Sequence, residues 1–554
     1  MEVAVRNLLS LLLVLSGAAL ADPVLPIGRI DTIGGTTYDW QMGGPAYRWI
    51  VNAPGHGVPV YWIRSLDTGT AFPDRNIGYN YYDYSTRKWL GNDTSDFMNS
   101  GVNVFTQRSG FGSLDINPKD ERSVLSAHMG TPLHLELARE VAPGSFVFEY
   151  SNSSPTVNGY LWPVTVVDTA GWTHAVLIDE ASRGRIFYAR TRTWEQWDSA
   201  RAVAAPQPEP MFPSHHIATS RVSHRVVLTW TFSEGAPDPG FYRETTDGGT
   251  TWQHPTELHW PPAFSGETVP SYHISGLFPY YDRHDRLHVV CPVMPYINGR
   301  GYIVPVEMWH WCRENSPQWS RIMRVDADSA SITCPVGYNA LLACRPSLGE
   351  DRNGGLHVCW EQFDTTNIEP GPPTYMRADI WWSEDNDDNG ASWRAPVRLT
   401  VPDATSKRFP SIMDWMSEDT LRVLYLVDLV AGFHVQGEGH PTENPIVVQH
   451  VPLSVGGVSD GPSLRPWERT FRMSPNPTSG NVRLEFSPAP PGSVKLSLFD
   501  RSGRSVFSAR LPGHPFTGSR SLDLSHFPAG VYLLRLETSD GASVQPVVLL
   551  KEEP

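Results

Sequence analysis

A short pattern repeats through the middle of this chain, and its spacing limits the folds that the chain can adopt. Four Pro-Ser pairs introduce apolar strands, and their prolines lie 57, 76 and 64 residues apart, at Pro213, Pro270, Pro346 and Pro410. Repeats of about this length are typical of propellers and arrays, in which each repeat supplies one sheet. The 46 Gly and 49 Pro among 554 residues also favour an all-β protein with many turns.

Histidine marks a second repeated position. His174, His288 and His357 each begin a run of small or branched apolar residues in a predicted strand. Because the three lie at matching points of the repeat, we expect them to have structural roles. His216 and His273 follow Pro-Ser pairs, where strands would line a central funnel, and we expect them to be packed or hydrogen-bonded there.

A third marker is a strand followed by a polar turn and a tryptophan. The clearest copy contains Thr245, Asp247, Gly249, Thr251 and Trp252, and a stretched copy contains Ser383, Asp385, Gly390, Ser392 and Trp393. In such a turn the carboxylate accepts backbone N–H groups, Gly adopts positive φ and Trp packs between sheets. The unit resembles the Asp box, or BNR repeat, of sialidase-like β-propellers. That resemblance implies a propeller whose boxes are structural turns, away from the ligand-binding face.

Counting the repeats predicts seven four-stranded sheets. Their starts lie near Pro45, Gly112, Pro163, Pro213, Pro270, Pro346 and Pro410. Six sheets are the alternative if residues 95–155, which carry little pattern, form an insertion. The segment Ile30–Gly34 is expected to pair with the last sheet and close the ring, which removes exposed edges. We expect residues 22–453 to form this β-propeller and residues 454–470 to form a linker.

Both termini indicate export. Residues 1–21 are typical of a signal peptide, with an apolar run at 8–15 and a cleavage site at Ala19-Leu20-Ala21. No later segment is long and apolar enough to predict a transmembrane anchor. Near the C-terminus, short alternating strands are separated by turns such as Pro475-Asn476-Pro477, Asp500-Arg501-Ser502-Gly503-Arg504 and Pro528-Ala529-Gly530. This pattern predicts a small β-sandwich over residues 471–554.

The C-terminal motifs resemble, in the same order, the C-terminal sorting domain of type IX secretion substrates. The resemblance implies that outer-membrane type IX secretion machinery is a partner. It also implies a secreted protein, or one on the outer surface of a Gram-negative-type bacterium, with removal of the tail at the surface as a further option.

Calcium is the only cofactor that a motif indicates. Asp385, Asp387 and Asn389 offer oxygen atoms at alternating positions before Gly390, which suits Ca²⁺. The glutamate expected at position twelve is replaced by Pro396, so a solvated acidic insertion in an Asp box is the favoured alternative.

The five cysteines lie in one window, at Cys291, Cys312, Cys334, Cys344 and Cys359. Export permits one or two disulfides, and the odd number leaves a free thiol. We favour apolar strand positions for most of them, because no Cys-x-x-Cys spacing is present.

A catalytic site is not identified. Sialidase chemistry would need three arginines around one carboxylate, and the candidates are Arg48, Arg345 and Arg408. Arg48 lies in Tyr47-Arg48-Trp49-Ile50, which lacks the proline of the family's motif, so sialidase activity is disfavoured.

Several aromatic residues are candidates for stacking on sugars, with core packing as the default: Tyr79, Tyr81, Tyr82, Tyr84, Tyr280, Tyr281, Trp309 and Trp311. The net charge of −15 argues against a nucleic-acid partner. The predicted function is binding of an extracellular glycan or protein through the funnel face. The alternatives are a glycoside hydrolase acting on an extracellular polysaccharide and a structural component of a surface layer.

Overall fold

The computed structural model describes two parts of the chain. The first is residues 26–453, apart from gaps at 43–46, 156–158, 180–184, 204–212, 233–238, 266, 268, 270, 328–330, 372–373 and 388. The second is residues 472–550, apart from 475–477, 487–493, 500–504, 512–517 and 539–540. The predicted signal peptide, the predicted linker, Pro45, Pro270, the Pro475–Pro477 turn and the Asp500–Arg504 turn therefore lie outside the described residues. The chain divides into two compact units, residues 1–456 and 457–554.

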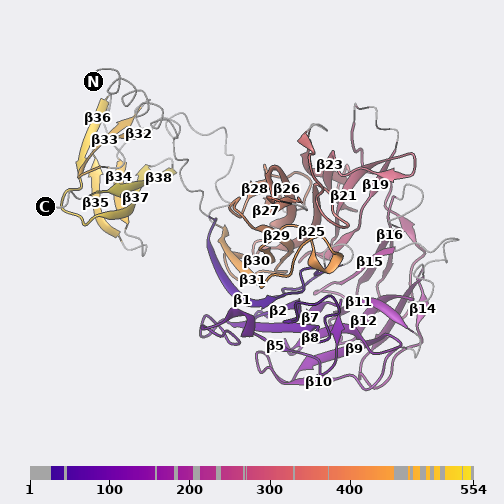
Figure 1. Cartoon of the computed structure of the whole chain (residues 1–554). Coiled ribbons are helices and arrows are strands. Elements are labelled where there is room, and N and C mark those ends of the chain that lie inside the picture. The colour runs from indigo at the N-terminus through magenta and orange to yellow at the C-terminus, as the bar shows by residue number, and fades with distance from the viewer. Residues whose placement is uncertain are drawn as a thin grey trace, which may run out of the picture. The chain divides into compact units, whose positions relative to one another are not determined.

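The described residues of the first unit form seven antiparallel sheets, which we name blades I to VII (Figure 1). Blade I contains β2 (Gly57–Arg64), β3 (Asn76–Asp83), β4 (Lys88–Trp89) and β5 (Val102–Asn103). Blade II contains β6 (Ser109–Gly110), β7 (Leu114–Ile116), β8 (Ser123–Met129), β9 (His134–Glu140) and β10 (Phe148–Tyr150). Blade III contains β11 (Tyr160–Val167), β12 (Thr173–Asp179), β13 (Ile186–Thr191) and β14 (Arg201–Ala202).

The remaining blades follow in chain order. Blade IV contains β15 (Pro213–Thr219), β16 (Val226–Phe232), β17 (Phe241–Thr245) and β18 (Thr256–Glu257). Blade V contains β19 (Tyr272–Ile274), β20 (Phe278–Tyr281), β21 (Leu287–Ile297), β22 (Arg300–Gly301), β23 (Val306–Cys312) and β24 (Trp319–Val325). Blade VI contains β25 (Ala343–Glu350), β26 (Leu356–Ile368), β27 (Met376–Glu384) and β28 (Val397–Arg398). Blade VII contains β29 (Ser406–Ile412), β30 (Thr420–Asp428), β31 (Asn444–Pro452) and β1 (Arg29–Thr36).

The sheets close into a β-propeller. Strand β1 pairs antiparallel with β31, with Arg29 opposite His450 and Thr36 opposite Asn444, which confirms the predicted closure of the ring. Neighbouring blades are in contact around the circle, since VII touches both VI and I. Residues 109–150, which an insertion would have occupied, form blade II. The helices described are short 3-10 turns at Phe97–Asn99 and His434–Gln436, and none of the described helices is long and apolar enough to cross a membrane.

The sequence predicted that every Pro-Ser pair begins a strand, but the structure shows this for only some of the described pairs. Pro213 does begin β15, but Pro346 and Pro410 lie inside β25 and β29, within a shift in strand register. At these bulges the residue before the proline, Arg345 or Phe409, has φ of +55°. Proline is tolerated there because the bulge interrupts the ladder of hydrogen bonds.

Side-chain burial decides two predictions. Tyr79, Tyr81, Tyr280 and Tyr281 are at most 2% exposed, and Tyr82, Trp309 and Trp311 are also buried, which agrees with core packing rather than sugar stacking. All five cysteines are buried and free, so the disulfides that export permits are not formed.

The second unit has its own core. Its described strands form a sheet of β32 (Arg472–Ser474), β33 (Asn481–Phe486) and β36 (Gly518–Asp523), and a sheet of β34 (Val494–Phe499), β35 (Ser505–Leu511), β37 (Gly530–Thr538) and β38 (Gly541–Leu549). Val482 and Leu484 of the first sheet share one apolar cluster with Leu498 and Leu534 of the second. Two sheets joined by one core form the predicted β-sandwich.

Candidate functional site

The propeller has two ends with different chemistry. In each blade the strands lie further from the axis in chain order, except that β1 is the outermost strand of blade VII. In blade I, Ile50 and Ala53 bridge to β2 and take the innermost place, so β2 and β3 are the second and third strands. The innermost strands therefore all run in one direction along the axis. We call the end where they begin the front face and the end where they finish the rear face. The front face carries the connections into inner strands and those from second to third strands. The rear face carries the turns from inner to second strands and from third to outer strands, including both Asp boxes.

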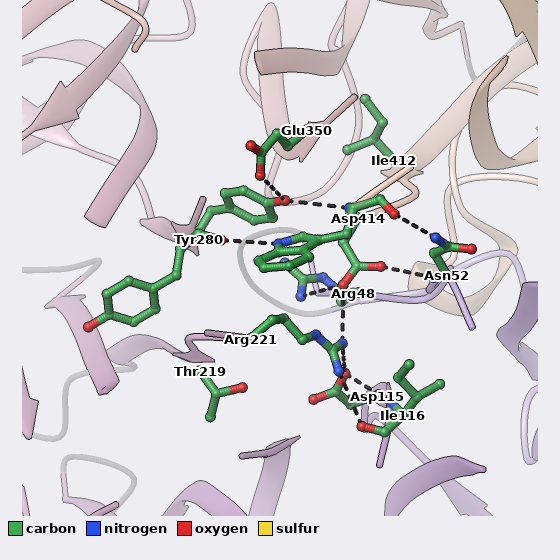
Figure 2. A network of polar contacts seen from close by, with 12 residues as sticks. Arg48, Asn52, Asp115, Ile116, Thr219, Arg221, Tyr280, Glu350, Ile412 and Asp414 are labelled. Carbon is green, nitrogen blue, oxygen red and sulfur yellow. Dashed lines mark hydrogen bonds and ion pairs between the residues drawn. The ribbon is translucent and has the colours of Figure 1, made fainter. Parts of the chain in front are cut away.

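A network of charged side chains joins several blades at the rear face (Figure 2). Arg221, just after β15, donates to Asp115 at 2.6 Å and to Asp414 at 3.2 Å, and Arg48 contacts Asp414 at 3.4 Å. Both carboxylates also accept backbone N–H groups, from Val167 at 2.8 Å and Asn52 at 2.9 Å. Burial alone would lower the pKa of Arg221, but the two carboxylates raise it above its usual value.

Glu350 extends this rear group at the end of β25. The Tyr280 hydroxyl donates to its carboxylate at 3.5 Å, as Figure 2 shows, and the backbone N–H of Arg283 donates at 2.9 Å. Its side chain is fully buried, and burial raises its pKa to about 8. Two arginines face two aspartates here and every carboxylate has partners, so this end holds blades together and offers little to a ligand.

The repeated histidines also lie at the rear. His174, His288 and His357 place Nε2 at 3.2, 3.2 and 3.4 Å from an aspartate six residues earlier. Each aspartate accepts N–H groups from the turn that follows the inner strand. Each histidine uses Nδ1 to reach the third strand of its blade, at Tyr188, His310 or Trp382. These contacts give the three histidines the structural role that their repeated positions predict.

The clearer Asp box forms a tight turn after β17. Asp247 accepts from the N–H of Thr251 at 2.9 Å and from its hydroxyl at 2.6 Å, while the Thr245 hydroxyl donates to Asp247 at 2.7 Å. Gly249 has φ of +84°, and a Cβ there would overlap the Tyr188 hydroxyl of blade III. Trp252 packs edge-on against Tyr188, with ring centroids 4.8 Å apart.

The stretched box, in blade VI, makes the same kind of contact with blade V that the clearer box, in blade IV, makes with blade III. Gly390 has φ of +68°, and a Cβ there would overlap the His310 ring of blade V. Trp393 packs edge-on against His310 at 5.3 Å. Ser383 donates to the carbonyl of Arg394 at 2.8 Å, and Asn386 donates to the Ser392 hydroxyl at 3.1 Å. In both boxes the glycine and the tryptophan thus pack against the same aromatic ring of the preceding blade.

The predicted calcium ligands face their own turn. Asp385 accepts from the N–H groups of Leu356 at 2.9 Å and Gly390 at 3.0 Å, and burial raises its pKa to about 7. Asp387 and Asn389 both accept from the N–H of Ala391. Among the described residues, no three His, Cys, Asp or Glu side chains are grouped to hold a metal ion. The calcium site stays a prediction.

The three arginines considered for a sialidase do not meet around one pocket. Arg48 lies in the rear network, whereas Arg345 and Arg408 both donate to Glu361. Burial alone would raise the pKa of Glu361, but the two arginines lower it to about 2. All three of these side chains are buried, so the two cations are already neutralised inside the protein.

The front face gathers residues that the sequence patterns did not single out. Arg75, in the connection from β2 to β3, donates from Nε to the carbonyl of Ser109 at 2.9 Å and from Nη1 to the Tyr38 hydroxyl at 3.3 Å. Its Nη2 lies 3.5 Å from Nε2 of His128, at the end of β8. The rings of Tyr38 and Phe111 lie 5.4 and 5.1 Å from the guanidinium carbon.

Backbone strain recurs at bulges of the inner strands, and one of these bulges lies beside Arg75. Phe111 and Trp162, at bulges in the inner strands of blades II and III, have φ of +49° and +47°. Arg345 and Phe409 take the same conformation in blades VI and VII. Positive φ is costly for such bulky residues and tends to persist at functional sites.

The funnel histidines are packed as expected. His216 lies between the rings of Tyr47 and Phe278, at 5.9 and 5.1 Å. His273 is buried against Tyr296, and burial lowers its pKa to about 4.

Exposed aromatic side chains lie on one side of the front face, in connections of blades IV to VI. Among the described residues of the propeller, the exposed aromatics are Tyr150, Trp260, Tyr302 and Tyr338. The last three, at 36%, 47% and 54% exposure, lie in connections on the front face, and we name them the aromatic rim. Tyr338 rests edge-on against Trp40, with ring centroids 5.3 Å apart.

The propeller is similar to several solved structures at low sequence identity. A polysaccharide lyase, Uly1, is 11% identical, with a TM-score of 0.42 over 77% of this chain and 100% of that one. The lectin BP39L of Burkholderia pseudomallei is 9% identical, with a TM-score of 0.39 over 76% and 99%. An intramolecular trans-sialidase of Ruminococcus gnavus is 10% identical, with a TM-score of 0.38 over 77% and 97%. No curated protein matches the sequence.

The tail matches a known family. Residues 472–550 match the model of the secretion system C-terminal sorting domain, and this range contains every described strand of the second unit. The chain therefore ends in a type IX secretion sorting domain and is a secreted or cell-surface protein.

Proposed function

We propose that the propeller binds an extracellular glycan at its front face after export through the outer membrane of a Gram-negative-type bacterium. The aromatic rim carries this proposal, because Trp and Tyr rings that stay exposed offer flat apolar faces to sugar rings. Three of the four exposed aromatics of the described propeller lie on this one face, which is also where the inner strands are strained.

Binding is favoured over hydrolysis by the state of the front-face carboxylates. Glycoside hydrolysis uses two carboxyl groups about 5–10 Å apart that both reach the substrate. Glu361 is neutralised by two arginines, and Asp39 accepts the backbone N–H groups of His434 and Val435. Both side chains are buried, as is Asp428, so none of these three acids is poised to reach a sugar.

A glycan array and a panel of reporter glycosides, both applied to the full chain, test the proposal. We expect binding to at least one glycan without turnover of any glycoside, and weaker binding after Tyr338→Ala. Turnover of a glycoside would replace the binding proposal with the hydrolase alternative. A protein that binds no glycan would favour a structural role in a surface layer.

A further inference from the structure

Arg75 is a buried arginine whose charge is not matched within the described part of the chain. Only 7% of its surface is exposed, and no described Asp or Glu forms an ion pair with it. Its acceptors are a carbonyl, a phenol and an imidazole, all neutral. The contacts of Nη1 and Nη2, at 3.3 and 3.5 Å, are longer than usual hydrogen bonds, so the guanidinium still has donor capacity to offer.

A second unmatched arginine reinforces this charge. Arg108 is exposed and, among the described residues, donates to the carbonyls of Phe72 at 3.0 Å and Ala71 at 3.4 Å and to no carboxylate. Arg108 lies close to Arg75, because the carbonyl of Phe72 accepts from Nε of Arg108 and from the backbone N–H of Arg75. Burial and then the charge of Arg75 lower the pKa of Arg108. Burial, Arg75 and Arg108 also lower the pKa of His128 to about 3, so this imidazole stays neutral beside them.

The surroundings of Arg75 fix its guanidinium in place. The rings of Tyr38 and Phe111 lie near it, and a Cβ on Gly110 would come within 2.9 Å of its Nε. Aromatic faces attract a cation, but they do not supply the oxygen acceptors that its N–H groups prefer. Three other buried arginines, Arg221, Arg345 and Arg408, all meet carboxylates. The buried Arg64 has no described ion pair either, but it donates to the carbonyl oxygen of Met98 at 2.7 Å.

We infer that the glycan bound at the front face carries an anionic group, a carboxylate or a sulfate ester, and that this group binds Arg75 with support from Arg108 and the Tyr38 hydroxyl. A planar guanidinium binds such oxyanions with two parallel hydrogen bonds, and the anion would supply the missing counter-charge. This inference rests on the proposed glycan binding. With a net charge of −15, the protein as a whole repels polyanions, so binding of one would report a local site.

Titration calorimetry of the full chain with four polymers tests this inference. Polygalacturonate is compared with its carboxyl-reduced form, and dextran sulfate is compared with dextran. We expect one or both acidic polymers to bind while their neutral partners bind at least tenfold more weakly. Preference for polygalacturonate identifies a carboxylate as the ligand group, and preference for dextran sulfate identifies a sulfate.

Variants test which arginines of the protein bind the acidic polymer. Arg75→Gln should weaken binding of the acidic polymer about tenfold or more, Arg75→Lys should weaken it less, and Arg108→Gln should weaken it severalfold. Arg352→Gln is the matched control, because Arg352 is an exposed arginine of the rear face that pairs only with Asp419, and this variant should bind as the wild type does. If Arg75→Gln does not fold, the exposed Arg108→Gln still decides the question.

Two results would overturn the inference, and they differ in whether they also contradict the proposed glycan binding. Equal affinity for acidic and neutral polymers, or unchanged affinity in both Arg75→Gln and Arg108→Gln, would remove the anion site and leave glycan binding standing. Failure to bind these polymers and every glycan of the array would remove the proposed function as well.

Discussion

The two ends of the propeller treat buried charge in opposite ways. At the rear, Arg221 and Arg48 meet Asp115 and Asp414, and each carboxylate also accepts a backbone N–H group. At the front, Arg75 is also buried, but its acceptors within the described part of the chain are all neutral. Arginines that are paired with carboxylates stabilise the fold, whereas a buried arginine without a carboxylate is expected where an anionic ligand can supply the counter-charge.

The two ends also differ in how their residues arise from the chain. The rear is built by units that recur, such as the Asp–His pairs and the two Asp boxes. The front is built by connections that share no pattern, such as those that carry Arg75, Tyr302 and Tyr338. The repeated parts therefore serve the fold, and the unrepeated parts are free to serve recognition.

The largest effect should come from breaking the rear network. Arg221→Met leaves Asp115 without its cation, and removing one partner of a buried ion pair costs roughly 3–5 kcal/mol of unfolding free energy. Arg75→Met should cost less, because no described carboxylate loses a partner. Denaturant unfolding of both variants measures the difference, with Arg352→Met as an exposed control within about 1 kcal/mol of the wild type. Equal losses for Arg221→Met and Arg75→Met would break the comparison between the ends.

The ends should also respond oppositely to pH. The pKa of Glu350 is raised to about 8, so the folded state keeps a proton that the unfolded state releases from about pH 4.5 upward. Its contribution to the unfolding free energy therefore falls as pH rises from about 4.5 to 8, by about 1.4 kcal/mol per unit. For His128, with a pKa lowered from 6.5 to about 3, the unfolded state takes up the proton first, and the contribution falls as pH drops through that window.

Unfolding curves over pH separate these contributions. Glu350→Gln should flatten the loss on the alkaline side and leave the acidic side unchanged. His128→Asn should do the reverse. A Glu350→Gln variant with the same alkaline slope as the wild type would show that Glu350 does not carry the rear-face effect.

The sequence predicted the repeated part of the molecule well. Strand periodicity and turn chemistry are local, so they gave the all-β propeller, its closure by the strand at Ile30–Gly34 and the structural histidines. The strand starts in blades VI and VII were predicted too late, because a proline at a bulge looks like a strand start when only the sequence is read.

The front-face group could not be predicted in the same way. These residues come from four segments, and none of them lies in a motif: Tyr38 follows β1 of blade VII, Arg75 and Arg108 lie in connections of blade I and between blades I and II, and His128 lies on β8 of blade II. Their meeting depends on the lengths of three irregular connections. The only local signal was the lack of an acidic residue immediately beside Arg108, which by itself says nothing about three-dimensional neighbours.

A smaller effect is expected from the Asp box, and it tests whether the rear face is structural only. Gly249→Ala would force a methyl group into the Tyr188 hydroxyl at a φ of +84°, and such overpacking costs about 1–3 kcal/mol. Gly371→Ala is the matched control, because its φ is +98° but no atom lies within 4 Å of the added methyl group. Thermal unfolding should show a larger loss for Gly249→Ala, while glycan affinity at a temperature where both variants are folded should match the wild type. Lost affinity in Gly249→Ala would mean that the rear face also contributes to binding.

The smallest expected effect is a loss of glycan affinity without a loss of stability, the opposite of the result expected for Gly249→Ala. Tyr338 is 54% exposed and rests on Trp40, so Tyr338→Ala removes an exposed ring without opening the core, and the unfolding free energy should change by less than about 0.5 kcal/mol. Loss of one stacked aromatic face should cost about 0.5–1.5 kcal/mol of binding, a reduction in glycan affinity of about threefold to tenfold. Tyr150→Ala provides the control, since Tyr150 is an exposed tyrosine on β10 of blade II that lies outside the aromatic rim. If both variants reduced affinity equally, the rim would have no special place in recognition. If only Tyr338→Ala did, while its stability held, the front face would be separated from the rear by function as well as by charge.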